Sequence, residues 1–493
     1  MTDLTQSVST PIRDHEAAQV ALAEVQDLLA RQKLETEVVH REKHTVGAER
    51  QALVEHLVAK QQSAALQARL DRLHPADIAY ILEALPREER LIIWDLVRAD
   101  RDGEILVEVS DAVRETLIAS MDREELVAAV ESLDTDELAA LAPDLPQEVV
   151  EEVREGLTIA EREQLRAAMS YPEGSVGARM DFEMVTIRDD VSLEVVLRYL
   201  RRFDELPDHT DQVFVVDRKD RLQGALPISR LLVHEPEIMV RDVMLTDIMT
   251  LQPLDDVGEA AQAFERYDLV SAPVVDEQGD LLGRLTVNEV VDVIREEGES
   301  DVFAQAGLRE EEDLFASVWE SARNRWLWLA LNLCTAFFAS RVIGAFEGTI
   351  ERVVALAALM PIVAGIAGNS GNQTMTLFIR SIALGQVNAK NAPRLVAREL
   401  GIACLNGLVW GSIAGAFAWW LYNDTDQGRL LGLTMMLAMF LNLLIGALIG
   451  ILVPMVLQQI GRDPAMGSSV LLTFSTDSMG FFIFLGLASL FFI

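Results

Sequence analysis

The sequence PIVAGIAGNSGNQT, from Pro361 to Thr374, decides the fold class because it places polar residues inside an otherwise apolar run. Glycines stand at 365, 368 and 371, with carboxamides at 369, 372 and 373 and a hydroxyl at 370. In hydrocarbon an unpaired polar side chain costs on the order of a few kcal/mol, so such residues face a bundle interior or a wet cavity. Glycines at i, i+3 and i+6 leave one helical face bare for a neighbouring helix or a passing ion. Two interpretations remain open: a packing seam of small residues, and a pore lining, which also explains the carboxamides.

The last third of the 493 residues is predicted to span a membrane. A bilayer core of about 30 Å takes roughly 20 residues to cross, and five apolar stretches are long enough. They cover residues 326–344, 353–384, 401–422, 430–458 and 466–493. The sequence therefore predicts a multidomain membrane protein that ends in an all-α pore domain of five spans, residues 326–493.

The distribution of basic residues predicts the orientation of these spans. Arg323 and Arg325 precede the first span, and Arg380, Arg394 and Arg398 lie around the loop between the second and third. Because basic residues favour the cytoplasmic side, we expect the N-terminal part inside the cell and, with five spans, the C-terminus outside. The opening residues lack the basic start and apolar core of a signal peptide. A multi-pass protein of the inner (plasma) membrane is expected.

Negative charge is concentrated before the membrane segments. The formal net charge is −36, and residues 324–493 hold only seven acids and nine bases, so residues 1–323 carry 71 acids against 33 bases. This balance argues against nucleic acid as a partner and for cations. A solvated acidic surface explains the same composition without a ligand. The cysteines, Cys334 and Cys404, lie in predicted spans, and His40 and His44 lie in a charged segment expected to be a surface helix.

Residues 1–49 are predicted to be a charged N-terminal arm, and residues 50–170 an acidic helical repeat. An apolar residue followed by a capping residue or proline recurs at twelve-residue intervals, from Leu85-Pro86 to Leu157-Thr158. Acids follow two or three places later in several units, as the first turn of a helix prefers. Such a period is typical of short helices stacked as an α-solenoid. Helix starts explain these acids without a metal site.

Residues 171–298 change to alternating strands and helices in two similar halves. Each half has a helix, a strand ending in Val-Val-Asp, a turn and a second strand. The second copy, APVVDEQGDLLGRLTVNEVVDVI at residues 272–294, and the α+β duplication resemble a tandem pair of CBS domains. That resemblance implies adenine nucleotide binding through a motif matched in part here: Gly283 and Thr286 are present, and Glu289 replaces its Asp.

Two further features of the sequence are a connecting segment before the spans and an acid inside the last span. Residues 299–325 follow the CBS pair and are predicted to be an amphipathic connecting helix, while Asp477 lies deep in the fifth span beside Thr473, Thr476 and Ser478. An intramembrane carboxylate indicates a functional site. The alternative is a buried Asp paired with Asn369 or Asn442.

This domain order, with PxxxGxxGNxGNQ in the second span and TDxxG in the fifth, resembles the MgtE family of magnesium channels and transporters from about residue 50 to the end. The resemblance implies a homodimer whose pore is lined by the second and fifth spans, with Asp477 selecting Mg²⁺. It also implies regulatory Mg²⁺ that shuts the pore when the internal ion is plentiful. The implied pore residues are Gly368, Asn369, Asn372, Gln373, Thr374, Thr473, Thr476 and Asp477, and the implied regulatory carboxylates are Glu289, Asp292, Glu297 and Asp301. This chain departs from the family at Asn288 and Ser300, where acids are common.

Three functions remain open. The first is a Mg²⁺-selective channel or transporter, with Mg²⁺ as transported and regulatory ion, ATP as a possible further ligand, and the bilayer and a second copy as partners. No catalytic constellation or Walker loop is present, so an enzyme is not expected. The second is a membrane-anchored CBS nucleotide sensor or scaffold, which leaves the 369–373 stretch and Asp477 unexplained. The third is a channel for Co²⁺, Ca²⁺ or Na⁺, although the absence of soft or imidazole ligands argues against tight transition-metal selectivity.

Overall fold

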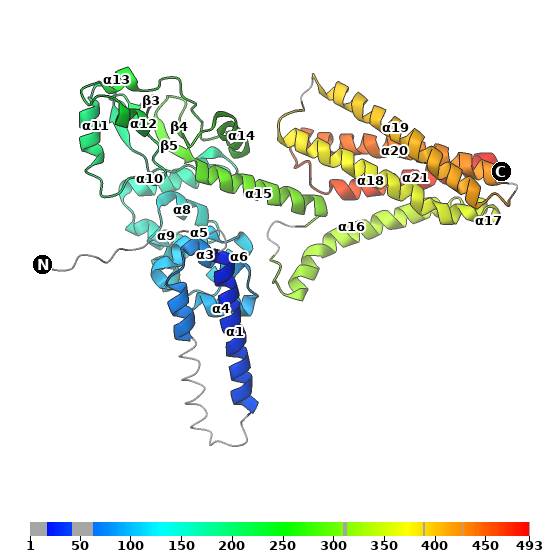
Figure 1. Cartoon of the computed structure of the whole chain (residues 1–493), viewed down its shortest axis with the longest axis horizontal. Helices are drawn as coiled ribbons and strands as arrows, with labels where there is room; N and C mark the ends of the chain where they lie inside the picture. Colours follow the sequence, from blue (N-terminus) through cyan, green and yellow to red (C-terminus); the bar gives the residue numbers. More distant parts are fainter. Residues whose placement is uncertain (1–16, 42–62, 309–312, 388–389, 426, 493) are drawn as a thin grey trace. The chain divides into compact units, whose positions relative to one another are not determined.

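The computed structural model describes residues 17–41, 63–308, 313–387, 390–425 and 427–492. The chain divides into two compact units (Figure 1). The first comprises Met1–Arg295 with Asp313–Ala316, and the second comprises Glu296–Glu312 with Ser317–Ile493. Short helices and two small sheets build the first unit, and long helices build the second.

Short helices of the first unit begin at the predicted twelve-residue interval, which confirms the repeat. Their starts are residues 75, 87, 99, 111, 123, 135, 147 and 159. The elements are α3 (Pro75–Glu83), α4 (Arg87–Trp94), the 3₁₀ turn η1 (Ala99–Arg101) leading into α5 (Asp102–Glu108), α6 (Asp111–Ile118), α7 (Arg123–Val130), α8 (Thr135–Leu141), α9 (Gln147–Gly156) and α10 (Ile159–Ala168). Their apolar faces share one core.

Several acids of the repeat cap its helices, as predicted. At the start of α7 the Asp122 carboxylate accepts from the Glu125 backbone N–H at 3.0 Å, and the Glu125 carboxylate accepts from the Asp122 N–H at 2.9 Å. Thr158 and Glu161 make the same reciprocal pair at the start of α10. A capping box satisfies donors that have no partner within the helix. These acids are therefore explained by helix formation.

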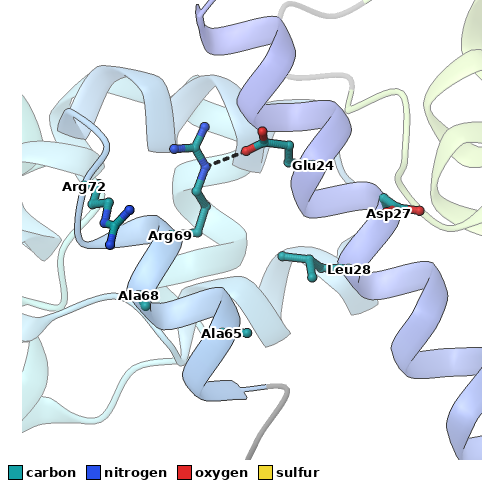
Figure 2. Close-up of a pocket in the computed structure, with 7 residues that line it drawn as sticks. All are labelled: Glu24, Asp27, Leu28, Ala65, Ala68, Arg69 and Arg72. Carbon is teal, nitrogen blue, oxygen red and sulfur yellow. Dashed lines mark ion pairs between the residues drawn. The ribbon is translucent and has the colours of Figure 1, made fainter. Parts of the chain in front are cut away.

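Helix α1 (Ala17–Arg41) extends the same core towards the N-terminus. Ala21, Val25 and Leu29, spaced by four residues, are buried with Leu66 and Leu70 of the helix over residues 63–70. An open cavity of about 370 Å³ lies between these two helices, and Arg69 and Glu24 form an ion pair of 2.7 Å at its edge. Figure 2 shows the residues that line it. His44 and the side chain of His40 lie outside the described residues.

A fully buried arginine fixes a distant segment of the chain within the first unit. The Arg90 guanidinium donates to the backbone carbonyls of Leu82 at 2.9 Å and Leu85 at 3.2 Å, and its Nη1 lies 2.8 Å from the Asp313 carboxylate. Asp313 is 13% exposed. Because a buried guanidinium is stable only when paired, this ion pair anchors residues just ahead of the first membrane helix.

The CBS pair is confirmed. In the first copy, β1 (Thr186–Arg188) is parallel to β2 (Gln212–Val216), which is antiparallel to β3 (Leu222–Pro227). In the second copy, β4 (Ser271–Val275) is antiparallel to β5 (Leu281–Thr286). The helices of this region are α11 (Leu193–Leu200), α12 (Ile228–Val233), α13 (Val240–Val243) and α14 (Val257–Tyr267), with a 3₁₀ turn η2 (Val176–Ala178).

The two CBS copies join through their turns. The Leu222 N–H donates to the Gly279 carbonyl at 3.0 Å, and the Leu281 N–H donates to the Asp220 carbonyl at 3.2 Å. In each copy, the N–H of the first residue of the last strand thus donates to the turn of the other copy. This reciprocal pairing follows from the duplication in the sequence.

The predicted connecting helix over 299–325 is not one separate helix. Helix α15 (Val287–Ala306) starts in the second CBS copy and runs on without interruption, and α16 (Val318–Gly344) begins the membrane part. Gly307 ends α15 in a left-handed conformation, φ 71°. Glycine adopts this conformation without steric cost, which makes it the usual residue just past a helix end.

The second unit contains α16, the short α17 (Glu347–Arg352), α18 (Ala355–Ala383), α19 (Ala392–Leu421), α20 (Gly428–Gln459) and α21 (Ser468–Phe492) (Figure 1). Within the described residues, α16, α19, α20 and α21 are long and apolar enough to cross a membrane. The predicted second span corresponds to α18, which has 29 residues but carries the polar 369–373 stretch and is not among those four. Four of the five predicted spans are thus supported, and the membrane crossing by α18, the predicted second span, stays a prediction.

Trp328 of α16 joins the end of α15 to the start of α21. A methyl group placed on Gly307 would lie 2.9 Å from the Trp328 ring, and one on Gly467 would lie 2.7 Å from it. Gly467 also has a left-handed backbone, φ 65°, and its N–H donates to the Ala304 carbonyl of α15 at 3.4 Å. Only residues without a side chain allow the indole to approach both chain turns.

Candidate pore and regulatory sites

Helix α18 packs on α20 through backbone that is free of bulky side chains. A methyl group on Gly446 would lie 2.7 Å from the Ala367 carbonyl oxygen, and one on Gly450 would lie 2.6 Å from the Gly371 carbonyl oxygen. Gly371 itself is buried, with the Gly446 oxygen 2.9 Å from its missing methyl position. We call this contact the α18–α20 seam. The packing interpretation therefore holds for Gly371.

The polar residues of α18 lie on a different face. Asn369, Asn372 and Gln373 are exposed, together with Gly365, which has no atom within 4 Å of its missing methyl position. Positions 365, 369, 372 and 373 recur at helical spacing and form one stripe. The stretch thus serves two faces: one that packs within the chain, and one that the chain leaves uncovered.

Asp477 of α21 lies close to this stripe. A methyl group on Gly368 would lie 3.5 Å from the Thr476 hydroxyl oxygen, so α18 and α21 meet one residue before Asn369 and one before Asp477. The Asp477 side chain is half-buried. In the part of the chain that the structure describes, no hydrogen bond or ion pair reaches its carboxylate. A carboxylate at this depth without a partner is costly and is a mark of function.

The hydroxyls of Thr473 and Thr476, on either side of the turn that leads to Asp477, bond to their own helix. Thr476 donates to the Leu472 carbonyl at 3.0 Å, and Thr473, which is exposed, donates to the Ser469 carbonyl at 2.9 Å. The alternative that Asp477 pairs with Asn442 is wrong. The Asn442 amide instead donates to the carbonyls of Val363 at 3.1 Å and Thr476 at 3.2 Å. No hydrogen bond from Asn369 to Asp477 occurs among the described residues either.

Sequence reasoning missed Glu399, a second acid within a membrane helix. The predicted third span began at residue 401, but α19 begins at Ala392 and places Glu399 two turns inside. Its carboxylate lies 3.5 Å from the hydroxyl of Thr374, which is buried on α18. The nearby Arg394 and Arg398 made Glu399 look like an interfacial residue. Thr374 therefore contacts α19 rather than the exposed stripe.

The predicted regulatory carboxylates all lie on α15, but not on one face of it. Glu289 and Asp292 are one turn apart, while Glu297 and Asp301 form a second pair further along the helix. Asp292 lies 3.9 Å from Arg295. The side chain of Asp301 is outside the described part of the chain. Among the described residues, no group of three or more acids, histidines or cysteines is arranged to hold a metal ion.

Glu289 instead lies near acids of the helical repeat. Burial, together with the charges of Asp181 and Glu289, raises the pKa of Asp136 at the start of α8 to about 7. Asp181 is held by Arg284, whose Nε donates to it at 2.8 Å, yet burial still raises the pKa of Asp181. Nothing in the sequence indicates this group, because Asp136 looks like an ordinary first-turn acid and the contact depends on tertiary packing.

The residues of the partial nucleotide motif are structural in this conformation. A methyl group on Gly283 would lie 2.7 Å from the Asp181 carbonyl oxygen, and Arg284 exchanges two backbone hydrogen bonds with Asp181. Thr286 is buried. Nucleotide binding through Gly283, Thr286 and Glu289 stays a prediction.

Three family models match the chain in the predicted order. Residues 73–174 match the MgtE intracellular N domain, residues 240–296 match the CBS domain, and residues 360–487 match MgtE, described as a divalent cation transporter. The third match contains the α18 stretch and Asp477.

Two relatives extend over most of the chain. The magnesium transporter MgtE of Bacillus subtilis is 29% identical over 423 residues, 86% of this chain and 93% of the relative. The magnesium transporter MgtE of Thermus thermophilus is 28% identical over 435 residues, 86% of this chain and 95% of the relative. A crystal structure of the cytosolic domain of the Mg²⁺ channel MgtE in complex with ATP is 28% identical, with a TM-score of 0.44, and the match covers 48% of this chain and 98% of that one. The three family models and the two relatives make this chain similar, over most of its length, to the MgtE magnesium transporters.

Proposed function

We propose that the protein is a homodimeric, Mg²⁺-selective channel that admits Mg²⁺ down its electrochemical gradient and closes when internal Mg²⁺ is high. The observation that carries this proposal is Asp477, half-buried and without a partner among the described residues, at the level where the polar stretch of α18 meets α21. With no cation among the described residues of its own chain to neutralise it, this carboxylate is suited to a passing cation.

The chemistry of Mg²⁺ fits one carboxylate per chain. Mg²⁺ gives up its water reluctantly and is usually held by one or two carboxylates with several waters retained. Two copies of Asp477 facing each other would supply two carboxylates, and the amides of Asn369, Asn372 and Gln373 would bind the waters. A water-mediated site is weak enough for an ion to leave as well as enter. An inside-negative potential contributes about 2.3 kcal/mol per charge per 100 mV.

The uncovered stripe on α18 supports a dimer. Three exposed carboxamides facing lipid would each lack hydrogen-bond partners. A second copy that applies the same stripe across a two-fold axis would enclose the amides around water and ions. A membrane crossing by α18, which makes five spans, belongs to this proposal, as do the inner membrane and an external C-terminus.

Regulation would use acids of the helical repeat, of the CBS pair and of α15. Asp181 and Glu289 raise the cost of ionising Asp136, and a hydrated Mg²⁺ near these three carboxylates would offset that repulsion. Glu297 and Asp301 continue the negative charge further along α15. We propose that ion binding at these carboxylates favours the closed state.

Reconstituted vesicles test the transport proposal. The full chain should carry Mg²⁺ into liposomes, and Asp477→Ala should abolish the flux because it removes the carboxylate that replaces part of the ion's hydration. Asp477→Asn should leave slow and poorly selective permeation. The control is Asp463→Asn: this acid lies before α21 and accepts from the Ala465 backbone N–H at 2.8 Å, so flux should persist.

Two outcomes would overturn the proposal. One is an Asp477→Ala protein that is folded and dimeric and carries Mg²⁺ at the wild-type rate. The other is a wild-type protein that moves no divalent cation, as expected of a CBS sensor or scaffold. Faster flux of Co²⁺ or Ca²⁺ than of Mg²⁺ would keep the channel and change its ion.

A further inference from the structure

Asn442 lies at the centre of the membrane bundle, on a helix to which the proposed function assigns no pore residue. It is 0% exposed, and the two hydrogen bonds of its amide nitrogen go to two different helices, to the Val363 carbonyl of α18 and the Thr476 carbonyl of α21. Carbonyl oxygens only accept, so the amide must present its NH₂ group to both. One side chain of α20 thus bridges the two helices that carry the polar stripe and Asp477.

The surroundings of Asn442 are shaped to hold it. A methyl group on Gly480 would collide with the Asn442 amide, so α21 can approach only because residue 480 has no side chain. Along α20, Asn442 is followed one turn later by Gly446, which begins the α18–α20 seam against Ala367. The bridge therefore continues a contact that fixes the axial position of α18.

The bridge leaves one polar atom unsatisfied. The Asn442 carbonyl oxygen is buried and has no hydrogen-bond partner among the described residues. An unpaired buried acceptor destabilises a protein, and an apolar residue of similar shape can be neutral or stabilising at such a position. Stability alone does not account for an asparagine here. What asparagine provides and leucine does not is a pair of donors that sets the spacing of two helices.

We infer that Asn442 is a positioning residue for ion selectivity, which rests on the proposed transport function. Its amide fixes the Thr476 carbonyl, next to Asp477, relative to the α18 backbone six residues before Asn369. Mg²⁺ demands a near-ideal octahedral arrangement at short distance, while the larger Ca²⁺ accepts irregular geometry. Loss of the Asn442 hydrogen bonds should therefore reduce Mg²⁺ permeation more than Ca²⁺ permeation.

The test compares two ions in one preparation. Purified full-length protein in liposomes is assayed for Mg²⁺ and Ca²⁺ uptake, and their ratio does not depend on how many molecules are active. Asn442→Leu keeps the number and branching of the side-chain heavy atoms and removes both donors. The Mg²⁺/Ca²⁺ ratio should fall about tenfold, as when an outer partner of a metal ligand is lost. The matched control is Thr434→Val: Thr434 is equally buried on α20 but donates only to its own helix, to Leu430 at 2.8 Å. The Mg²⁺/Ca²⁺ uptake ratio of Thr434→Val should be unchanged.

A second pair of variants disturbs the bridge from the other side, in case Asn442→Leu does not fold. Gly480→Ala pushes on the amide and should lower the ratio in the same direction. Gly486→Ala on the same helix should not, since the atom nearest to its missing methyl position is 4.0 Å away. Hydrogen exchange in peptides after Val363 and after Thr476 should quicken in Asn442→Leu and not in Thr434→Val.

The outcomes separate the inference from the function on which it rests. An unchanged ion ratio in folded Asn442→Leu or Gly480→Ala, or an equal fall in Thr434→Val, would overturn the positioning role while Mg²⁺ transport stands. A wild-type protein that moves neither ion would overturn the transport function and with it this role. Unchanged exchange in Asn442→Leu would show that the bridge does not hold the helices.

Discussion

Gly371 and Gly365 show how one helix separates packing from exposure. The missing methyl position of Gly371 lies 2.7 Å from a Leu472 carbon and 2.9 Å from the Gly446 backbone oxygen. The Leu472 side chain can move, but the backbone of α20 has to shift as a whole. Gly365 has open space around it within the single chain. The same substitution therefore has different consequences six residues apart.

We expect Gly371→Ala to destabilise the membrane domain by about 1–3 kcal/mol, as overpacked cores do. Gly365→Ala should leave the melting temperature unchanged or slightly raised, because alanine favours the helix. Thermal unfolding in detergent, followed at equal protein concentration, measures both. If Gly365→Ala lowered stability as much as Gly371→Ala, the face assigned to the open stripe would be wrong.

At this scale the sequence identified the polar stretch and Asp477, but not how the glycines divide between the two faces. Three glycines at i, i+3 and i+6 suggested one bare face. The deciding information lies in the partner helix, because Gly446 and Gly450 of α20 select Gly371 for close contact. Nothing in residues 361–374 alone specifies that choice.

Among the elements, α8 and α15 are linked by charge. Asp136 lies in the first turn of α8 and Glu289 in the first turn of α15. The pKa of Asp136 is raised to about 7 by burial and by the charges of Asp181 and Glu289. The unfolded chain titrates this group near pH 3.9. Between these values the folded state binds more protons than the unfolded state. The free energy of unfolding contributed by Asp136 is thus fully present below about pH 4 and is lost as pH rises through about 7.

Asp136→Asn mimics the protonated side chain and should raise the melting temperature of the first unit by several degrees at pH 8 without Mg²⁺, and by a smaller amount at pH 5. Calorimetry of the full chain across pH 5 to 8 measures it. Asp217→Asn is the control of opposite sign: hydrogen bonds, led by the one from the Lys219 backbone N–H, lower the pKa of Asp217, so its loss should destabilise at pH 8. Identical pH profiles for wild type and Asp136→Asn would contradict the assignment.

The elements themselves were largely predictable. Apolar and capping residues at a strict period specify where each repeat helix begins, since those starts depend on local chemistry. Strands and turns of the CBS copies followed from their duplication. The extent of α15 was missed because acids after residue 296 suggested a separate helix, although Gly307 is a typical helix end. The contact between α8 and α15 required the folded chain.

For the whole molecule, charge is the dominant quantity. Residues 1–323 carry a formal charge of −38, from 33 bases and 71 acids, and a dimer would double it. With little divalent cation such units repel themselves and each other. Each bound ion favours the state that holds it by RT ln(1 + [Mg²⁺]/Kd), which is about 1.4 kcal/mol per site at ten times Kd.

We therefore expect about 10 mM Mg²⁺, roughly ten times a millimolar Kd, to protect residues 171–325 from limited proteolysis. Neutralising Asp292→Asn and Glu297→Gln together should weaken this protection and leave channels open, in inside-out patches, at Mg²⁺ levels that close the wild type. Asp100→Asn is the control, because Asp100 forms an exposed ion pair with Arg98 at 2.7 Å in the repeat. Equal cleavage with and without Mg²⁺ would contradict a sensor made of these carboxylates.

The packing of Trp328 between Gly307 and Gly467 has a consequence for when its contacts form during synthesis. Gly307 and Trp328 leave the ribosome within about twenty residues of each other, whereas Gly467 follows 139 residues after Trp328. The indole can therefore contact Gly307 at the end of α15 early in synthesis. Its contact with Gly467 cannot form until the chain has been made as far as the start of α21. A nascent chain thus cannot complete the packing of Trp328 between Gly307 and Gly467 until synthesis reaches α21. The helix that carries Asp477 is therefore also the helix whose arrival completes this contact.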